Sequence, residues 1–81
     1  MTTKVRIQYF ALLRQERGQT SEVVNTDALS PRHLYEELKN RHSFSLKANQ
    51  LAVAVNDQFA SWDQQLKDND SIVFIPPVAG G

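Results

Sequence analysis

The chain has 81 residues, nine basic and nine acidic side chains, and no cysteine. Its length predicts one small domain, and its balanced charge argues against nucleic acid or an anionic membrane as the main partner. The lack of cysteine excludes disulfides, thiolate metal sites and thiol nucleophiles, and no stretch is typical of a signal peptide or a membrane span, so we expect a cytoplasmic protein.

The first third of the chain predicts two strands joined by a short helix. Residues 4–10 alternate between apolar and mostly polar side chains, which is typical of a half-buried strand. Residues 11–17 fit about two helical turns, which Gly18 ends. Residues 20–26 predict a second strand with Val24 directed inward, and we expect it to pair with the first strand.

A longer helix follows in the middle of the chain. Ser30 suits the N-cap and Pro31 suits the first helical position, so the helix is expected to begin here. Leu34 and Leu38 are four residues apart and therefore share the face that we expect to cover the core. The helix is predicted to end near His42, and a loop follows it.

Three more strands are predicted before the end of the chain. Residues 51–56 predict the third strand, and Asn56-Asp57 predicts a turn. Residues 59–61 are expected to form a short return strand, and residues 62–66 a tight helical turn. Residues 71–75 predict the last strand, which leads directly into the C-terminal tail.

This order of elements predicts an α+β domain over residues 1–75. The first and last strands must lie side by side if both ends of the chain share one core. Two connected strands, a covering helix and three further strands match the layout of a ubiquitin-like β-grasp, in which a mixed sheet of four to five strands packs on one main helix. The detailed topology of this expected fold rests on the family resemblance given below. Residues 76–81 are expected to leave this domain as an extended tail.

The C-terminal tail has an unusual composition. Its residues are Pro76, Pro77, Val78, Ala79, Gly80 and Gly81. The two prolines cannot donate to a strand ladder and favour an extended conformation. A terminal glycine carboxylate has no Cβ beside it, so the active site of another protein can close around it. The tail is therefore predicted to enter a partner rather than to be an ordinary frayed end.

Exposed apolar side chains are expected at the base of this tail. If Phe74 points into the core, Ile75 points outward, because strand side chains alternate. Phe10 falls on the outer face of the first strand by the same count, and Phe59 extends the surface. We interpret these residues as a docking patch, with Arg14 able either to pair with an acidic partner group or to remain solvated. The alternative is that bulges turn some of them inward, or that single exposed apolar residues have no role.

Several classes of active site are not predicted. His33 and His42 are too far apart along one helix to bind the same ion, so we expect no metal site. No serine lies in a nucleophile-elbow motif, and no glycine-rich loop is present to bind phosphate. We therefore expect neither catalytic side chains nor a cofactor bound by the chain itself.

Three segments resemble one known family. They are Phe10-Ala11-x-x-Arg14, the stretch at 51–56, and the ending Phe74-Ile75-Pro76-Pro77-Val78-Ala79-Gly80-Gly81. The sequence resembles the small, sulfur-carrying subunit of molybdopterin synthase over essentially its whole length. The Pro-Pro-Val-x-Gly-Gly ending is the most specific part. Members often have an aromatic residue in place of Ile75, which we interpret as a tolerated exchange within the docking patch.

The resemblance implies a function for the terminus. A ubiquitin-activating-type enzyme would adenylate Gly81 with ATP and magnesium, and a persulfide donor would convert it to a thiocarboxylate. The large synthase subunit would bind Phe10, Arg14, Phe59 and Ile75 and would admit residues 76–79, with Gly80 and Gly81 reaching its active site. Sulfur would then pass to cyclic pyranopterin monophosphate, building the dithiolene that binds molybdenum or tungsten. The implied assembly is a heterotetramer of two small and two large subunits, with all catalytic side chains in the large one.

Other functions fit the same ending. A second hypothesis is that the chain carries sulfur for thiamine synthesis or for tRNA thiolation. A third hypothesis is a ubiquitin-like modifier that joins Gly81 to lysines of target proteins. A passive interaction domain is a fourth.

Overall fold

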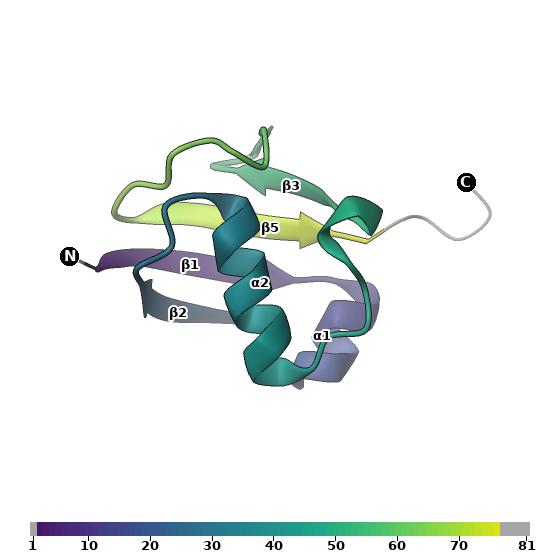
Figure 1. Ribbon diagram of the computed structural model, residues 1–81. Coiled ribbons are helices and arrows are strands. Elements are labelled where there is room, and N and C mark those ends of the chain that lie inside the picture. Colours follow the sequence, from purple (N-terminus) through teal and green to yellow (C-terminus); the bar gives the residue numbers. More distant parts are fainter. Residues whose placement is uncertain (1, 77–81) are drawn as a thin grey trace.

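The computed structural model describes residues 2–76 and shows a sheet with a helix across one face (Figure 1). The elements in chain order are β1 Thr3–Tyr9, α1 Ala11–Arg17, β2 Ser21–Thr26, α2 Pro31–His42, the 3-10 turn η1 Ala48–Gln50, β3 Ala52–Val55, β4 Gln58–Phe59 and β5 Asp70–Ile75. Residues 77–81 of the predicted tail lie outside the described residues. The division of the chain between residues 75 and 76 therefore stays a prediction.

The strands form one mixed sheet in the order β2-β1-β5-β3-β4. β1 and β5 are parallel, with Ile7 opposite Ile72, and the other neighbouring strands are antiparallel. This arrangement confirms the predicted α+β class and β-grasp layout, including the contact between the first and last strands. β5 lies in the middle of the sheet, so the chain leaves the domain from a strand that is paired on both sides.

Local sequence signals set the limits of the two helices. In α2, the Ser30 hydroxyl accepts a hydrogen bond from the His33 N–H at 3.3 Å, as an N-cap should. α2 ends at His42, and its C-cap Ser43 adopts a left-handed conformation and donates its N–H to the Lys39 carbonyl. α1 ends at Gly18 with φ of 80°, and the Gly18 N–H donates to the Arg14 carbonyl at 2.9 Å. The predicted cap residues therefore act as expected.

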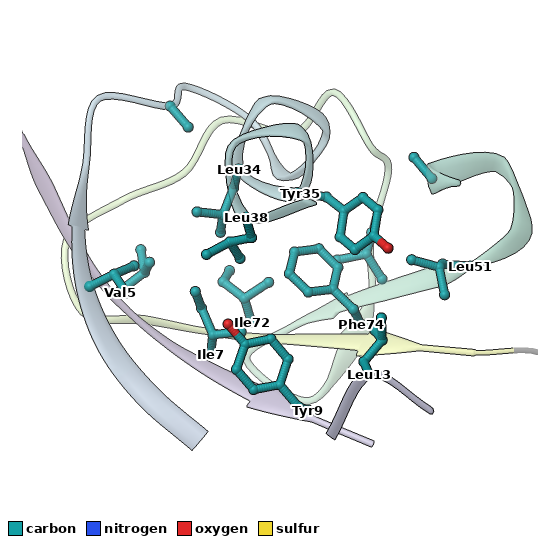
Figure 2. Close-up of a cluster of buried hydrophobic side chains, with 14 of the residues drawn as sticks. Val5, Ile7, Tyr9, Leu13, Leu34, Tyr35, Leu38, Leu51, Ile72 and Phe74 are labelled. Atoms are coloured by element: carbon teal, nitrogen blue, oxygen red, sulfur yellow. The ribbon is translucent and has the colours of Figure 1, made fainter. Parts of the chain in front are cut away.

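The core lies between α2 and the sheet (Figure 2). Leu34 and Leu38 of α2 are fully buried and face the buried strand residues Ile7 and Ile72. Aromatic rings fill the end of the core nearest the tail. The pairs are Tyr35 with Phe74 at 5.1 Å between ring centroids, Tyr35 with Phe44 at 5.9 Å, and Trp62 with Phe74 at 6.0 Å. The last core residue of β5 is thus fixed from several sides immediately before the tail begins.

The segment between β4 and β5 differs from the prediction. Residues 62–66 are not helical: one turn closes where the Gln64 N–H donates to the Ser61 carbonyl at 3.2 Å, and the chain then continues without regular structure. The groups that would make the next helical hydrogen bond bind elsewhere. The Leu66 N–H donates to the Leu29 carbonyl at 3.0 Å, and the Trp62 carbonyl accepts from the Arg32 N–H at 3.1 Å.

The return strand is also shorter and earlier than predicted. β4 covers Gln58–Phe59 instead of residues 59–61. Asn56 and Asp57 both have positive φ, so a two-residue turn places Gln58 directly opposite Val55. The tightness of this turn, which residue types alone did not specify, moves the start of the strand by one residue.

Candidate docking surface

An apolar surface lies on the face of the sheet that points away from α2, which we call the outer face. Tyr9 pairs with Phe74 in the β1–β5 register, so Phe10 and Ile75 follow as neighbours. On β3, Ala54 stands between Val73 of β5 and Phe59 of β4. We name Phe10, Ala54, Phe59, Val73 and Ile75 the tail-root patch. Phe59 is 79% exposed and Phe10 is 41% exposed, so the patch presents two aromatic rings to solvent, as binding hot spots often do.

Phe10 reaches this patch in a different way from the one expected. β1 ends at Tyr9, and Phe10 is the residue that precedes α1. Its backbone is still extended, with φ of −125° and ψ of 152°, so the alternation of side chains continues for one more residue. Ala11 then turns the chain into α1 with a positive φ of 51°. The prediction that Phe10 points outward is confirmed, although Phe10 is not part of the strand.

The other predicted site residues divide into two groups. Arg14 is exposed on α1, and none of the ion pairs between described residues includes it. Pro76 is half-buried where β5 ends. Pro77, Val78, Ala79, Gly80 and Gly81 lie outside the described residues. The structure therefore brings together the predicted patch and the first residue of the tail.

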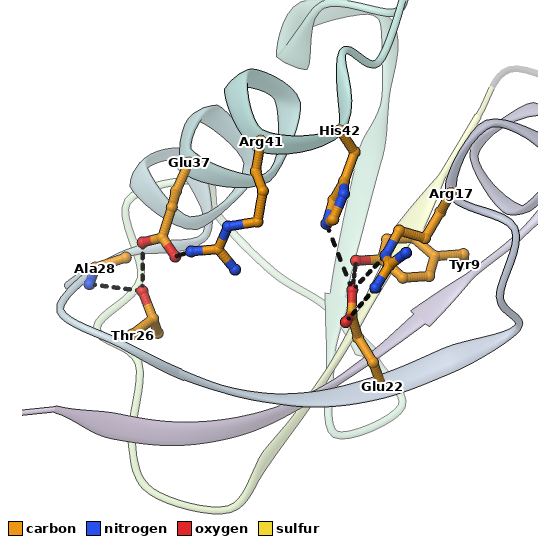
Figure 3. A network of polar contacts seen from close by, with 8 residues as sticks. All are labelled: Tyr9, Arg17, Glu22, Thr26, Ala28, Glu37, Arg41 and His42. Atoms are coloured by element: carbon orange, nitrogen blue, oxygen red, sulfur yellow. Dashed lines mark hydrogen bonds and ion pairs between the residues drawn. The ribbon is translucent and has the colours of Figure 1, made fainter.

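A polar cluster that the sequence analysis did not predict fixes α1 against the sheet (Figure 3). The Glu22 carboxylate of β2 accepts two hydrogen bonds from the Arg17 guanidinium, at 2.9 and 3.0 Å. It also accepts one from the Tyr9 hydroxyl at 2.5 Å. The His42 Nε2 atom lies 3.8 Å from the same carboxylate. The cluster joins β1, β2, α1 and the end of α2, and it ties the C-terminal end of α1 to β2.

The charges of this cluster shift its pKa values in opposite directions. Hydrogen bonding from Arg17 is the main cause that lowers the pKa of Glu22 to about 2. Burial, with the neighbouring Glu22 carboxylate, raises the pKa of Tyr9. Burial and the Arg17 charge lower the pKa of His42, and its Nε2 atom has no hydrogen-bond partner among the described residues. The cluster at neutral pH is thus one Arg–Glu ion pair with a neutral Tyr and a neutral His.

The polar cluster could have been found from one signal in the sequence. Val24 was expected to point inward, so Glu22, two residues earlier, must point the same way. A carboxylate on the core side of a strand needs a partner, because an unpaired buried charge is costly. The partner Arg17 lies on a different element, however, and only the fold brings it within reach.

Neither a metal-binding cluster nor a membrane-spanning helix is found among residues 2–76. No group of three or more His, Cys, Asp or Glu side chains is arranged there to bind a metal ion. The helices in this part of the chain are too short or too polar to cross a membrane.

Known proteins resemble this chain over almost its whole length, including the residues after 76. The model of the ThiS family matches residues 7–81. The chain belongs to the ThiS family. This match runs through residues 77–81 and so includes the C-terminal end of this ThiS-family protein.

Individual relatives agree with this assignment. The molybdopterin synthase sulfur carrier subunit of Escherichia coli is 30% identical over 80 residues, which cover 95% of this chain and 99% of the relative. The structure of a putative molybdopterin converting factor subunit 1 from Pyrococcus furiosus superposes with a TM-score of 0.78. That protein is 35% identical, and the match covers 94% of this chain and 99% of the other.

Another solved structure with the same fold holds the matching chain in a complex with a second subunit. It is a complex of subunits 1 and 2 of the molybdopterin-converting factor from Helicobacter pylori. The matching chain has a TM-score of 0.67 and 24% identity, and the match covers 98% of this chain and 100% of that one. At this identity the likeness shows only that the two chains share a fold.

Proposed function

We propose that this ThiS-family protein is the sulfur carrier of molybdopterin synthase and that Gly81 carries the sulfur. The proposal is carried by one observation. The paired strand β5 ends at the tail-root patch, in which Phe10 and Phe59 are exposed, in a chain that is 30% identical to the Escherichia coli sulfur carrier subunit over 95% of its length. A rigid domain with an apolar surface at the root of an acyl terminus suits the delivery of that terminus into a partner.

The chemistry follows from the state of the terminal carboxylate. A C-terminal carboxylate is ionised at neutral pH and is a poor electrophile. Adenylation with ATP converts the Gly81 carboxylate to a mixed anhydride and releases pyrophosphate. The terminal sulfur of a persulfide donor attacks the acyl carbon, and AMP leaves. A thiol then cleaves the S–S bond of the resulting acyl disulfide, which releases the thiocarboxylate and leaves the donor sulfur in a disulfide with that thiol. Reduced thiols are maintained in the cytoplasm, so we place the reaction there.

The docking step assigns a role to the tail-root patch. Phe10, Phe59 and Ile75 would pack on the large synthase subunit, and Arg14 would lie at the edge of the contact. The six tail residues, which reach at most ~20 Å when extended, would then bring Gly81 to the active site of that subunit. There the thiocarboxylate would donate sulfur to cyclic pyranopterin monophosphate, with two deliveries for each dithiolene. We infer a heterotetramer of two carriers and two large subunits.

Deleting Gly81 tests the carrier function. The truncated protein should unfold at the same denaturant concentration as the full chain, because the described core ends at Phe74, but it should not support sulfur transfer in a reconstituted synthase. Molybdopterin formation at the normal rate by the truncated chain would refute the proposal. Intact-mass spectrometry provides the positive test, because exchange of one oxygen for sulfur raises the mass of the activated full-length chain by about 16 Da. Conjugates to lysines of other proteins would indicate a modifier instead.

A further inference from the structure

The outer face of the sheet changes character along its two parallel central strands. The outward residues of β1 begin with Lys4 and Arg6, and Phe10 follows the strand on the same face. The outward residues of β5 begin with Ser71 and end with Ile75. Because β1 and β5 are parallel, both strands are polar at their starts and apolar where the tail leaves. The tail-root patch therefore occupies one end of the face, and a cationic region occupies the other.

The cationic end contains a hollow of about 320 Å³. Its lining consists of Lys4, Val5, Arg6, Val23, Asn69 and Ser71. Four of these side chains can donate hydrogen bonds, two of them are cations, and none is acidic. Such a lining is complementary to an anion.

Three arginines of this domain have an acidic partner, whereas the two cations of the hollow do not. Arg17, Arg32 and Arg41 form ion pairs with carboxylates at 2.9 to 3.1 Å. None of the ion pairs between described residues includes Lys4 or Arg6. The nearby Asp68 carboxylate accepts a hydrogen bond from the Lys4 backbone N–H at 2.7 Å and does not line the hollow. The hollow thus carries two cations without a counter-charge of its own.

We propose that this hollow receives an aspartate or glutamate side chain of the protein that docks on the tail-root patch. The inference rests on the proposed function, because it takes the large synthase subunit as that protein. Phe10 lies four positions after Arg6 along an extended chain, so the acidic group would lie ~13 Å from the aromatic contact at the tail root. An apolar contact alone leaves a partner free to rotate about the tail. A second, charged contact at this distance would fix the orientation in which the tail enters.

Charge reversal at the hollow tests the proposal. The double variant Lys4→Glu/Arg6→Glu should bind the large subunit at least about tenfold more slowly at low salt, because like charges oppose steering at the edge of an interface. The wild-type association rate should fall between ~0.05 M and ~0.5 M salt, whereas that of the double variant should not. Surface plasmon resonance with the full-length chain measures both quantities. Thermal melting verifies that the variant is folded, and we expect no loss, because both side chains are exposed.

Matched variants separate this inference from the proposed function. Lys47→Glu reverses a charge in the loop before β3, away from the hollow, and should leave the association rate within about twofold of the wild type. Phe10→Asp tests the patch itself. If Phe10→Asp weakens binding and the double charge reversal does not, the docking function stands and the carboxylate site is refuted. If the isolated chain binds inorganic phosphate at the hollow with a sub-millimolar Kd, the hollow serves a free anion and the inference is also wrong.

Discussion

Glu22 is a charged residue on the side of its strand that faces the core, and this placement makes the stability of the fold depend on pH. Its side chain is only 16% exposed, yet the pKa of Glu22 falls to about 2 because Arg17 and Tyr9 donate hydrogen bonds to the charged form. The carboxylate therefore favours the folded state only while it is ionised. It also links the first helix to the second strand, so its protonation would loosen α1 next to the docking surface.

Glu22→Gln should lower the free energy of unfolding at pH 7 by about 2–3 kcal/mol, since the glutamine cannot form the ion pair with Arg17. The sign of the pH dependence follows from the pKa values. The folded pKa of about 2 lies below the ordinary value of 4.5, so the contribution of Glu22 is complete above pH 4.5 and is lost as the pH falls toward 2. The difference between wild type and variant should shrink to less than about 1 kcal/mol near pH 2.

Urea denaturation at a series of pH values measures this difference. Glu36→Gln is a suitable control, because Glu36 is an exposed residue of α2 and accepts no hydrogen bond from the described side chains. A difference between wild type and Glu22→Gln that is the same at pH 7 and pH 2 would show that the carboxylate is not held in its charged form.

At the scale of single elements, the β3–β4 hairpin shows what residue types determine and what they do not. Asn56-Asp57 predicts a turn, and the turn is there. Both residues have positive φ, which is the conformation of the tight hairpin turns whose preferred second residue is glycine. The sequence could not reveal that the Asn56 side chain also bridges to β5. Its amide donates to Asp70 at 2.9 Å, and its oxygen accepts from the Ser71 N–H at 2.9 Å.

The two turn residues should therefore respond in opposite ways to glycine. Asp57→Gly should raise the free energy of unfolding by about 0.5 kcal/mol, because a positive φ costs glycine nothing and costs other residues about 1 kcal/mol, part of which the flexible unfolded chain offsets. Asn56→Gly should lower it by about 2 kcal/mol, because two hydrogen bonds to β5 are lost. Chemical denaturation of the pair compares them directly. Equal effects of the same sign would mean that backbone conformation alone decides stability at this turn.

At the scale of the whole molecule, strand alternation and the order of the elements predicted the α+β class and the outward position of Phe10 and Ile75. The detailed topology rested on the family resemblance, and the polar cluster around Glu22 was not predicted. The spacing of Val5, Ile7 and Tyr9 specified one face of β1, and the last strand had to lie beside it. The same count put Phe10 and Ile75 together on the outer face. The partners of Glu22 and the turn at residues 62–66 depend on elements distant in the sequence, such as Arg17 and Leu29. Only the assembled tertiary structure determines those contacts.

A substitution of Phe10 should affect the stability of the fold and the affinity for the partner differently. It occupies the N-cap position of α1, where aspartate is preferred, and its side chain makes no capping hydrogen bond. Phe10→Asp should therefore leave the free energy of unfolding unchanged or raise it by up to about 1 kcal/mol. The same change removes an aromatic anchor from the tail-root patch and introduces a charge there, so the affinity for the large subunit should fall at least about tenfold.

Calorimetric titration against the large subunit and thermal melting of the isolated chain measure the two effects of Phe10→Asp. The contrasting variant is Phe74→Ala. Phe74 lies on β5, which pairs with β1, and its ring is fully buried, so its loss should lower the free energy of unfolding by about 3–5 kcal/mol. A drop in stability for Phe10→Asp comparable to that for Phe74→Ala would show that Phe10 supports the core. Unchanged affinity with unchanged stability would leave Phe10 without a role in docking. Opposite responses of stability and affinity to one substitution are what a residue retained for its partner should produce.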